Sequence, residues 1–257
     1  MKYNYHTHTY RCNHAGGSDL EYARAAYDNG FVEIGFSDHV PQIGFKGIFD
    51  SWFRMAPEET AAYFDSINKL KEEFDGKMNI LSGFEVEYYP KHFQALCEHI
   101  APFAPDYLIL GQHFSNNEYD GEYLGDSGCH EEALWQYAQQ IEDALKTGLF
   151  TYLAHPDLPN FRGSEETLQK VHLRLCETAK AAGVPIECNL LGIKGNRWYP
   201  KKSFFEIAAK VGCPVVLGLD AHSPDAFNHE KEEKIALDLL RECGIIPIDK
   251  PIIRRPF

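Results

Sequence analysis

The sequence lacks several features that mark other classes of protein. Its seven cysteines include no C-x-x-C pair, and their odd number and wide spacing argue against a disulfide framework or a thiolate zinc site. No apolar run is long enough to span a bilayer, and the chain does not open with a basic segment followed by an apolar run. We therefore expect a soluble, cytoplasmic protein whose cysteines are reduced and structural.

Positive charge is also scarce. The chain has 25 Lys and Arg residues against 38 Asp and Glu residues, and its net charge is −13. This sign opposes binding to nucleic acid polymers and to anionic membranes. A small anion can still bind where local positive charge, such as bound metal ions, outweighs the acidic surface. We expect a small-molecule partner, with neither a nucleic acid polymer nor a membrane.

Short apolar runs alternate with amphipathic helical stretches along the 257 residues, without an internal repeat or a linker. A barrel of about 250 residues is commonly one domain, so we expect a single domain over 1–257. The alternation predicts a parallel sheet, either a closed barrel or a doubly wound sheet. Seven strands are expected, at 3–8, 32–39, 80–89, 106–113, 150–157, 184–191 and 214–222.

Helix ends can be recognised between these runs. Ser18 and Glu21 form a possible capping box for a helix that ends at Gly30, and Ser203 with Glu206 repeats the pattern. The segment 244–250 is a weak candidate for an eighth strand because it contains a proline. Further helices are expected at 57–75, 91–100, 130–147, 164–182 and 229–243.

Each apolar run ends in polar residues that can do chemistry. In a parallel barrel the carboxyl ends of all strands meet at one rim, whereas a doubly wound sheet gathers ligands from only a few strands. Contributions from six or seven strands therefore favour a barrel with its site at that rim. The strand-end residues are His6, His8, Asp38, His39, Glu85, His113, His155, Asn189, Asp220 and His222.

The spacing of these residues indicates a metal site. His6 and His8 stand two residues apart, so both side chains lie on one face of an extended strand. Glu85 and Asp220 lie within or directly after apolar runs, where an unpaired carboxylate is costly to bury and needs a cation. We expect the histidines in or beside helical stretches to be solvent-exposed, namely His92, His99, His130, His172 and His229.

The motifs together resemble the polymerase and histidinol phosphatase (PHP) family. They are HTH at 6–8, His14, SDH at 37–39, GFEVE at 83–87, GQH at 111–113, AHPD at 154–157 and DAH at 220–222. Within the family, the chain most resembles the monofunctional histidinol-phosphate phosphatases of bacterial histidine biosynthesis. The resemblance implies a distorted, TIM-like (β/α)7 barrel.

The resemblance also implies that nine ligands hold three divalent ions. His6, His8, Glu85 and Asp220 would hold the first ion, Glu85, His113 and His155 the second, and His14, His39 and His222 the third. Imidazole and carboxylate ligands suit zinc, iron or manganese. Glu85, Asp220 and His222 are predicted to be catalytic as well.

Such a centre predicts hydrolysis of a phosphomonoester. A hydroxide held between two ions attacks phosphorus while the ions neutralise the phosphate oxygens. By resemblance, the substrate is L-histidinol phosphate and the products are L-histidinol and phosphate.

Several loops at the rim could bind this substrate. Arg162 and Arg197 are predicted to bind phosphate, with surface salt bridges as the alternative. The acidic loop 114–128 could recognise a cationic substrate group, or simply be solvated; its carboxylates are Glu118, Asp120, Glu122 and Asp126, of which we assign Glu118 to the substrate. The aromatic loop 41–55 is either a lid or wall over the pocket or a satellite core packed on the barrel end.

Three alternatives stay open. Another phosphoesterase of the same family could act on nucleotides or phosphotyrosine. An amidohydrolase or deaminase also begins with His-x-His on a barrel, but its one or two ions would leave His14, His39 and His222 without a role. A non-catalytic metal-binding module is the third. Asp38 and Asp157, beside predicted ligands, could orient imidazoles or cap strand ends.

Overall fold

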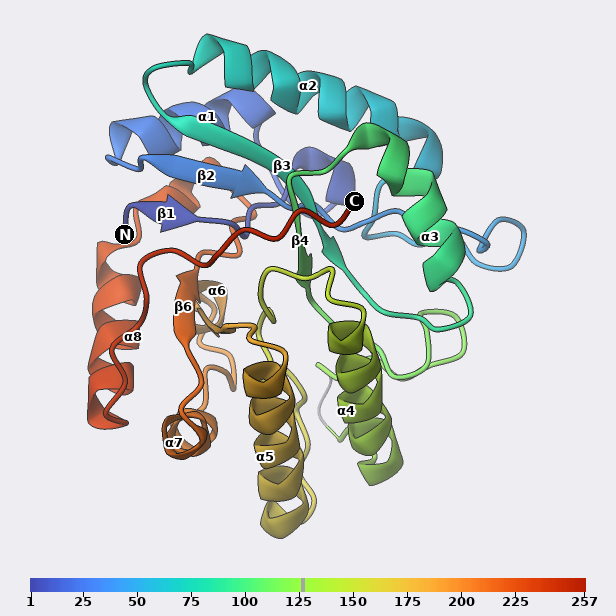
Figure 1. Ribbon diagram of the computed structural model, residues 1–257, viewed down its shortest axis with the longest axis vertical. Helices are drawn as coiled ribbons and strands as arrows, with labels where there is room; N and C mark the ends of the chain where they lie inside the picture. Colours follow the sequence, from blue (N-terminus) through green and yellow to red (C-terminus); the bar gives the residue numbers. More distant parts are fainter. Residues whose placement is uncertain (126–127) are drawn as a thin grey trace.

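The computed structural model of the chain describes residues 1–125 and 128–257. Its parallel strands form a curled half-barrel (Figure 1). Four strands pair in the order β1-β2-β3-β4, and β5 pairs with β6 in a second sheet. The strands are β1 (Tyr3–Asn4), β2 (Glu33–Phe36), β3 (Asn79–Val86), β4 (Tyr107–Leu110), β5 (Ile186–Asn189) and β6 (Val215–Gly218).

Isolated parallel bridges lie between the two sheets. Leu153 bridges both Leu110 at the end of β4 and Ile186 at the start of β5. On the other side, Thr7 bridges Ala221. The strand expected at 150–157 is therefore present only as the single residue Leu153, and the other six expected strands are found in shorter form.

The eighth strand considered at 244–250 is absent from the described part of the chain. The C-terminal segment instead follows the amino ends of the strands. Ile248 donates a backbone hydrogen bond to the carbonyl of Val215 at 2.8 Å, and the backbone of Arg254 donates to the Thr151 hydroxyl at 3.2 Å. This segment lies at the end of the strands opposite to the rim on which the sequence analysis places the site.

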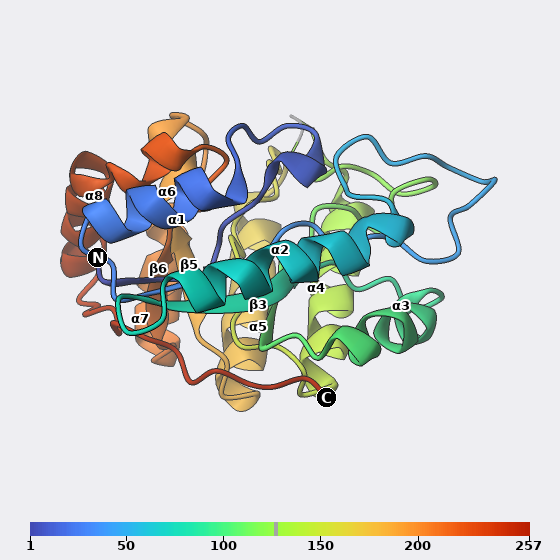
Figure 2. The same cartoon turned by 90° about the horizontal axis from the view of Figure 1, so that it is seen from above.

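Helices cover the outside of the sheets. Helices α1 and α2 lie over β1–β3, while α4, α5, α7 and α8 surround the half that contains β6 (Figures 1 and 2). The helices are α1 (Asp19–Asp28), α2 (Thr60–Glu73), α3 (Phe93–Ile100), α4 (Glu131–Lys146), α5 (Glu165–Ala181), α6 (Leu190–Lys194), α7 (Lys202–Val211) and α8 (Glu230–Glu242), with short 3-10 helices η1 (Tyr10–Cys12), η2 (Pro57–Glu59), η3 (Ala101–Phe103) and η4 (Pro224–Phe227). Among the described residues, no helix is both long and apolar enough to cross a membrane.

One of the two predicted helix caps is confirmed. Ser18 caps α1, and the Glu21 carboxylate accepts a hydrogen bond from the Ser18 backbone at 2.7 Å, which completes the capping box. The box predicted at Ser203 is wrong, because α7 already begins at Lys202 and Ser203 lies inside its first turn. This helix ends at Gly212, whose φ of 80° gives the left-handed end that glycine favours.

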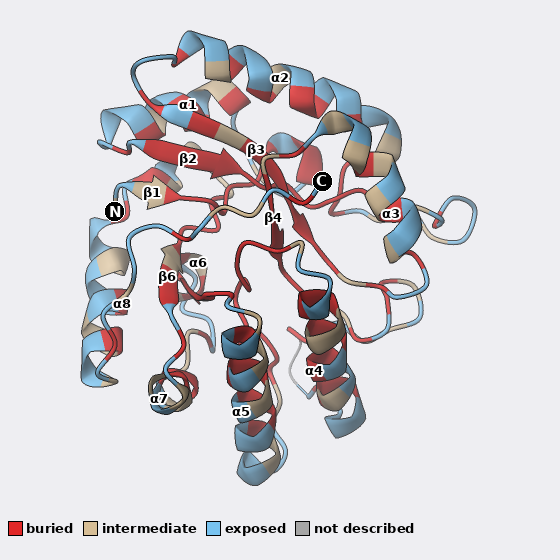
Figure 3. Cartoon of the chain, viewed as in Figure 1, coloured by how far each residue is buried: buried red, intermediate tan, exposed pale blue. Residues whose placement is uncertain are grey.

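The strands and the inner helix faces are buried (Figure 3), and they bury three histidines that the sequence analysis expected in solvent. His92, His172 and His229 are all buried, so that expectation is wrong for them, while His130 is exposed as expected and His99 is half-buried. His229 donates to the Phe227 carbonyl at 2.6 Å. Burial against α7 lowers the pKa of His172 to about 3, so this ring packs as a neutral aromatic group.

Candidate metal centre

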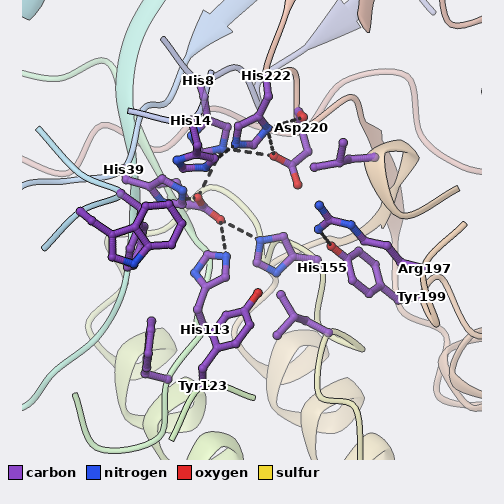
Figure 4. A pocket seen from close by; sticks show the side chains of 16 residues that line it. His8, His14, His39, His113, Tyr123, His155, Arg197, Tyr199, Asp220 and His222 are labelled. Carbon is purple, nitrogen blue, oxygen red and sulfur yellow. Dashed lines mark hydrogen bonds and ion pairs between the residues drawn. The ribbon is translucent and has the colours of Figure 1, made fainter. Parts of the chain in front are cut away.

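The predicted ligands converge on one cavity at the carboxyl ends of the strands (Figure 4). Its volume is about 690 Å³. The lining residues are His8, His14, His39, Trp52, Phe53, Glu85, His113, Phe114, Tyr123, His155, Leu158, Leu191, Arg197, Tyr199, Asp220 and His222. The segments that follow β1, β2, β4 and β6, together with β3 and the Leu153 segment, therefore bring polar residues to the same place, as expected of a parallel barrel, whereas Asn189 at the end of β5 does not line the cavity.

Glu85, on β3, lies at the centre of the ligand set. Its carboxylate is 1% exposed, and Oε1 lies 2.8 Å from His155 Nε2 while Oε2 lies 2.9 Å from His39 Nδ1. The space for this carboxylate depends on Gly111, because a Cβ there would lie 1.8 Å from Oε1. The two oxygens thus face different groups of imidazoles, as a bridging ligand must.

Asp220 faces the two histidines that follow β1. Its Oδ1 lies 3.2 Å from His8 Nε2 and 3.5 Å from His6 Nε2. The rings of His6 and His8 have centroids 5.2 Å apart, which confirms that the two side chains share one face. His6, His8 and Glu85 also form a group that could hold one metal ion, because one donor atom from each residue lies within 4.8 Å of the others.

A second group lies nearer the cavity mouth. His14, His39 and His222 place their donor nitrogens within 4.8 Å of one another. His14 Nε2 and His222 Nε2 are 2.9 Å apart, and Nδ1 of His14 donates to the Cys12 carbonyl at 2.7 Å. The set that the family resemblance implies for the third ion is therefore assembled from three separate segments of the chain.

The three residues implied for the second ion, Glu85, His113 and His155, are only partly grouped together. His113 and Glu85 group with His39, whereas His155 groups with His6 and Asp220. His155 also contacts Glu85 directly, and the His113 and His155 ring centroids are 4.8 Å apart. All nine predicted ligands therefore lie in one cluster. The ligands implied for the first ion and those implied for the second do not form two separate groups.

The chemistry of these donors fits divalent metal ions. Several buried donor atoms have no hydrogen-bond partner among the described residues, which is costly unless a cation satisfies them. The backbone supports the same conclusion, because His155 (φ 28°) and Asp220 (φ 50°) are held in left-handed conformations that cluster at functional sites. The atoms without a hydrogen bond, several of which lie at ion-pair distance from one another, include His6 Nε2, His8 Nε2, His39 Nδ1, Glu85 Oε2, His155 Nδ1 and Asp220 Oδ1.

The electrostatics keep the acidic ligands ionised. Burial raises the pKa of Glu85, but the imidazoles of His39 and His113 outweigh it and hold this pKa well below 4.5. Asp220 behaves in the same way beside His6. Burial lowers the pKa of His222 to about 3, with a smaller contribution from neighbouring imidazoles. This ring is therefore neutral at pH 7, as a metal ligand must be.

Two buried carboxylates that contact predicted ligands were missed by sequence reasoning. Glu187, on β5, accepts from His6 Nδ1 at 2.9 Å and from the His155 backbone at 3.0 Å. Glu87, after β3, accepts from His113 Nδ1 at 3.2 Å. A carboxylate inside or beside an apolar strand was the signal that identified Glu85, and the same signal marks both residues.

One cysteine lies beside the centre. The Cys12 thiol is fully buried and groups with His8 and His222 within 4.8 Å. All seven cysteines are free, which agrees with the expected absence of disulfides. The expectation that the cysteines are purely structural did not anticipate this position.

The predicted phosphate-binding arginines differ in position. Arg197 lines the cavity, and its Nη1 donates to the Tyr199 hydroxyl at 2.6 Å (Figure 4). Arg162 is exposed and is not among the lining residues. The structure thus places one of the two beside the predicted ligands.

The acidic loop turns one of its carboxylates, that of Glu118, inward. Glu118 is buried, and its Oε2 accepts from Arg54 Nε at 2.7 Å, so its position does not match the direct substrate contact that the sequence predicts. Asp120 accepts from Asn116, and Glu122 accepts from His130 at 2.7 Å. Asp126 lies outside the described residues.

The aromatic loop 41–55 combines both structures considered for it. Phe45 and Phe53 are buried in the manner of a satellite core, while Trp52 is 69% exposed and lines the cavity together with Phe53.

Asp38 lies 3.6 Å from His8 Nδ1 and also accepts from the His39 backbone. Asp157 accepts from the Lys201 backbone at 2.5 Å, so this carboxylate holds a loop.

Comparison with known proteins identifies the family of the chain. The PHP domain model matches residues 4–190. A protein named "Probable histidinol-phosphatase" from Deinococcus radiodurans is 31% identical over 231 residues, which cover 85% of each chain, and the "Histidinol-phosphatase" of Bacillus subtilis is 26% identical over 84% of this chain and 92% of its own. A crystal structure of histidinol phosphate phosphatase from Lactococcus lactis, complexed with zinc, L-histidinol and phosphate, aligns with a TM-score of 0.69 at 18% identity over 96% of this chain and 95% of that one. Because the family model covers more than half of the sequence, the chain belongs to the PHP domain family.

Proposed function

We propose that the protein is a metal-dependent phosphomonoester hydrolase that converts L-histidinol phosphate into L-histidinol and phosphate. The observation that carries this proposal is the clustering of the nine predicted ligands, eight of which line one cavity and six of which have a buried donor atom without a hydrogen bond among the described residues. The names of the curated relatives support the substrate. The zinc, histidinol and phosphate of the Lactococcus lactis crystal structure fit the same proposal.

We propose three divalent ions, of zinc, manganese or iron. The strongest support for the third is the group of His14, His39 and His222, which shares only His39 with the group that contains Glu85 and His113. Glu85 would contribute to two ions, because its two oxygens face different imidazoles. When bound, such ions supply an activated water nucleophile and neutralise phosphate oxygens.

The chain's own residues would then hold the substrate in place. Arg197 offers a guanidinium beside the predicted ligands that can pair with phosphate oxygens. Trp52, Phe53 and Tyr123 form an aromatic wall on the cavity, and such faces attract an imidazole ring or an ammonium group. The cationic group of the substrate would therefore bind to this aromatic wall and not to the acidic loop that sequence reasoning assigned to it.

An aromatic wall suits other phosphate esters as well. A nucleobase or the ring of phosphotyrosine could stack on Trp52, so a family member acting on nucleotides or phosphotyrosine is the second candidate. An amidohydrolase or a non-catalytic module is less compatible with the third imidazole group and with an arginine at the cavity.

We further propose that the chain closes into a single seven-stranded (β/α)7 barrel domain over 1–257. The bridges of Leu153 to both sheets and of Thr7 to Ala221 support this closure, since they lie where a seventh strand and the final seam belong.

Metal removal and restoration tests the proposed function. The purified chain is treated with chelator, and phosphate release from histidinol phosphate is measured before and after zinc, manganese or iron is added. We expect activity to disappear and then return, with close to three ions per chain. Recovery of ions without any hydrolysis of histidinol phosphate would refute the reaction, and a ceiling near one ion per chain would refute the ligand assignment.

A further inference from the structure

We propose that Arg54 and Glu87 are a positioning pair for the metal ligand His113, through which the aromatic loop 41–55 is fastened to the metal centre. This inference rests on the metal centre of the proposed function, and it assigns a role to two residues that hold no ion themselves. Glu87 orients the imidazole, and Arg54 holds Glu87.

The contacts of Glu87 fix the His113 ring. Glu87 is 1% exposed; its Oε1 accepts from His113 Nδ1 at 3.2 Å, and its Oε2 accepts from the backbone of His113 at 3.2 Å and of Phe114 at 3.4 Å. The bond at Nδ1 keeps the hydrogen on that nitrogen. Nε2 is therefore left with its lone pair and points toward Glu85, whose Oε1 lies 3.9 Å away.

Arg54 supplies the charge that keeps Glu87 in place. The Arg54 guanidinium is 3% exposed, and it donates to both Glu87 and Glu118 as well as to the Val40 carbonyl at 3.3 Å. Tyr89 donates a further hydrogen bond to Glu87. Without Arg54, two carboxylates would be buried with no cation between them and would repel each other. Glu87 would then lose the partner that holds it as the acceptor for His113.

The same arginine anchors the cavity wall. Its Cζ lies 4.4 Å from the Phe53 ring centroid, and Phe53 lines the cavity beside Trp52. The other end of the loop is held by Phe45, whose ring packs against His92 and Tyr119 at centroid distances of 5.1 and 5.0 Å. The wall and the ligand are therefore fixed by one buried cluster, and a change at Arg54 should disturb both.

Zinc affinity is the direct readout, because it needs no substrate. The variants are Arg54→Met and Glu87→Gln, titrated with zinc against a chromophoric chelator; cobalt titrations report the ligand geometry by visible absorption. We expect both variants to bind one of the ions about 10–100-fold more weakly than the unmodified chain, the range for lost partners of metal ligands, and to show an altered cobalt spectrum.

A matched ion pair distinguishes positioning from general destabilisation. Lys71 Nζ lies 2.7 Å from Asp106 Oδ2 near the amino end of β4, away from the metal centre, so Lys71→Met removes a partly buried pair without touching the ligands. Urea unfolding of the metal-free variants measures the stability that each loses, and Lys71→Met should keep the zinc affinity of the unmodified chain.

Two results would overturn the inference. One is an unchanged zinc affinity and cobalt spectrum in both Arg54→Met and Glu87→Gln. The other is a loss of affinity in Lys71→Met as large as theirs. The titration is valid whether or not the chain hydrolyses histidinol phosphate, so a failure of the proposed reaction is distinguishable from a failure of this inference.

Discussion

Replacing Glu85 by glutamine should be the most damaging single change to the metal centre. The substitution keeps the size of the side chain but removes its charge and one acceptor oxygen. A four-ligand structural zinc site binds with about 10–16 kcal/mol, so one ligand is worth about 3 kcal/mol, or about a hundredfold in the dissociation constant. Because the two oxygens of Glu85 face different imidazoles, two ions should each weaken by about this factor.

The assay compares ion content by elemental analysis, zinc affinity by chelator competition, and phosphate release from histidinol phosphate. Glu33→Gln is the matched control, since Glu33 is a buried carboxylate on β2 that pairs with Lys250 at 2.6 Å, away from the cavity. We expect the control to retain its ions, while Glu85→Gln loses two. Retention of all ions and of full activity in Glu85→Gln would refute the central position assigned to this residue.

Four further predictions concern the third ion, the two arginines and the pH dependence of metal binding. His14→Asn should remove one ion and leave two, because the only candidate ligand group that includes His14 is the one with His39 and His222; an unchanged ion content would contradict the third site. Arg197→Met should lower kcat/KM about 100-fold with metal content unchanged, the scale of one lost charge-stabilising contact, and a full rate would show that Arg197 does not bind phosphate. Arg162→Met, assayed in the same way, tests the second predicted arginine, for which the sequence predicts the same loss. Burial opposes protonation of His113, but two neighbouring carboxylates outweigh it and raise its pKa above 6.5. The ring is protonated below that pKa, and a zinc ion must displace the proton in order to bind. Zinc affinity should therefore fall between pH 8 and pH 6, by about tenfold per pH unit for each proton displaced. Isothermal titration across this pH range measures the slope.

The sequence predicted that the candidate ligands lie at one rim, because each strand end can be recognised from a short stretch of residues. A run of apolar residues that ends in His or Asp indicates a strand end, and all strand ends of a parallel sheet lie on one side. His6, Glu85, His113 and Asp220 could therefore be assigned to one rim before any contact was known. The strands themselves are shorter than expected, since the backbone leaves the extended conformation at the ligands, as the positive φ of Asp220 shows.

The partners of the ligands could not be predicted in the same way. Whether Glu118 faces substrate or a buried arginine depends on where loop 41–55 packs, which no spacing in the sequence determines. The buried histidines were missed for a related reason. His172 lies on a helix face that packs on Phe204 of another helix, and a neutral imidazole is stable there although its sequence pattern is that of a polar surface residue.

The most direct test of the proposed function is the specificity of phosphate release. The zinc-loaded chain is assayed for kcat/KM with histidinol phosphate, p-nitrophenyl phosphate, phosphoserine, a phosphotyrosine peptide and nucleoside monophosphates. Histidinol phosphate should lead by at least about 100-fold, because the aromatic wall of the cavity adds contacts to its imidazole and ammonium that simple esters lack. A flat profile, or a preference for nucleotides or phosphotyrosine, would contradict the proposed substrate.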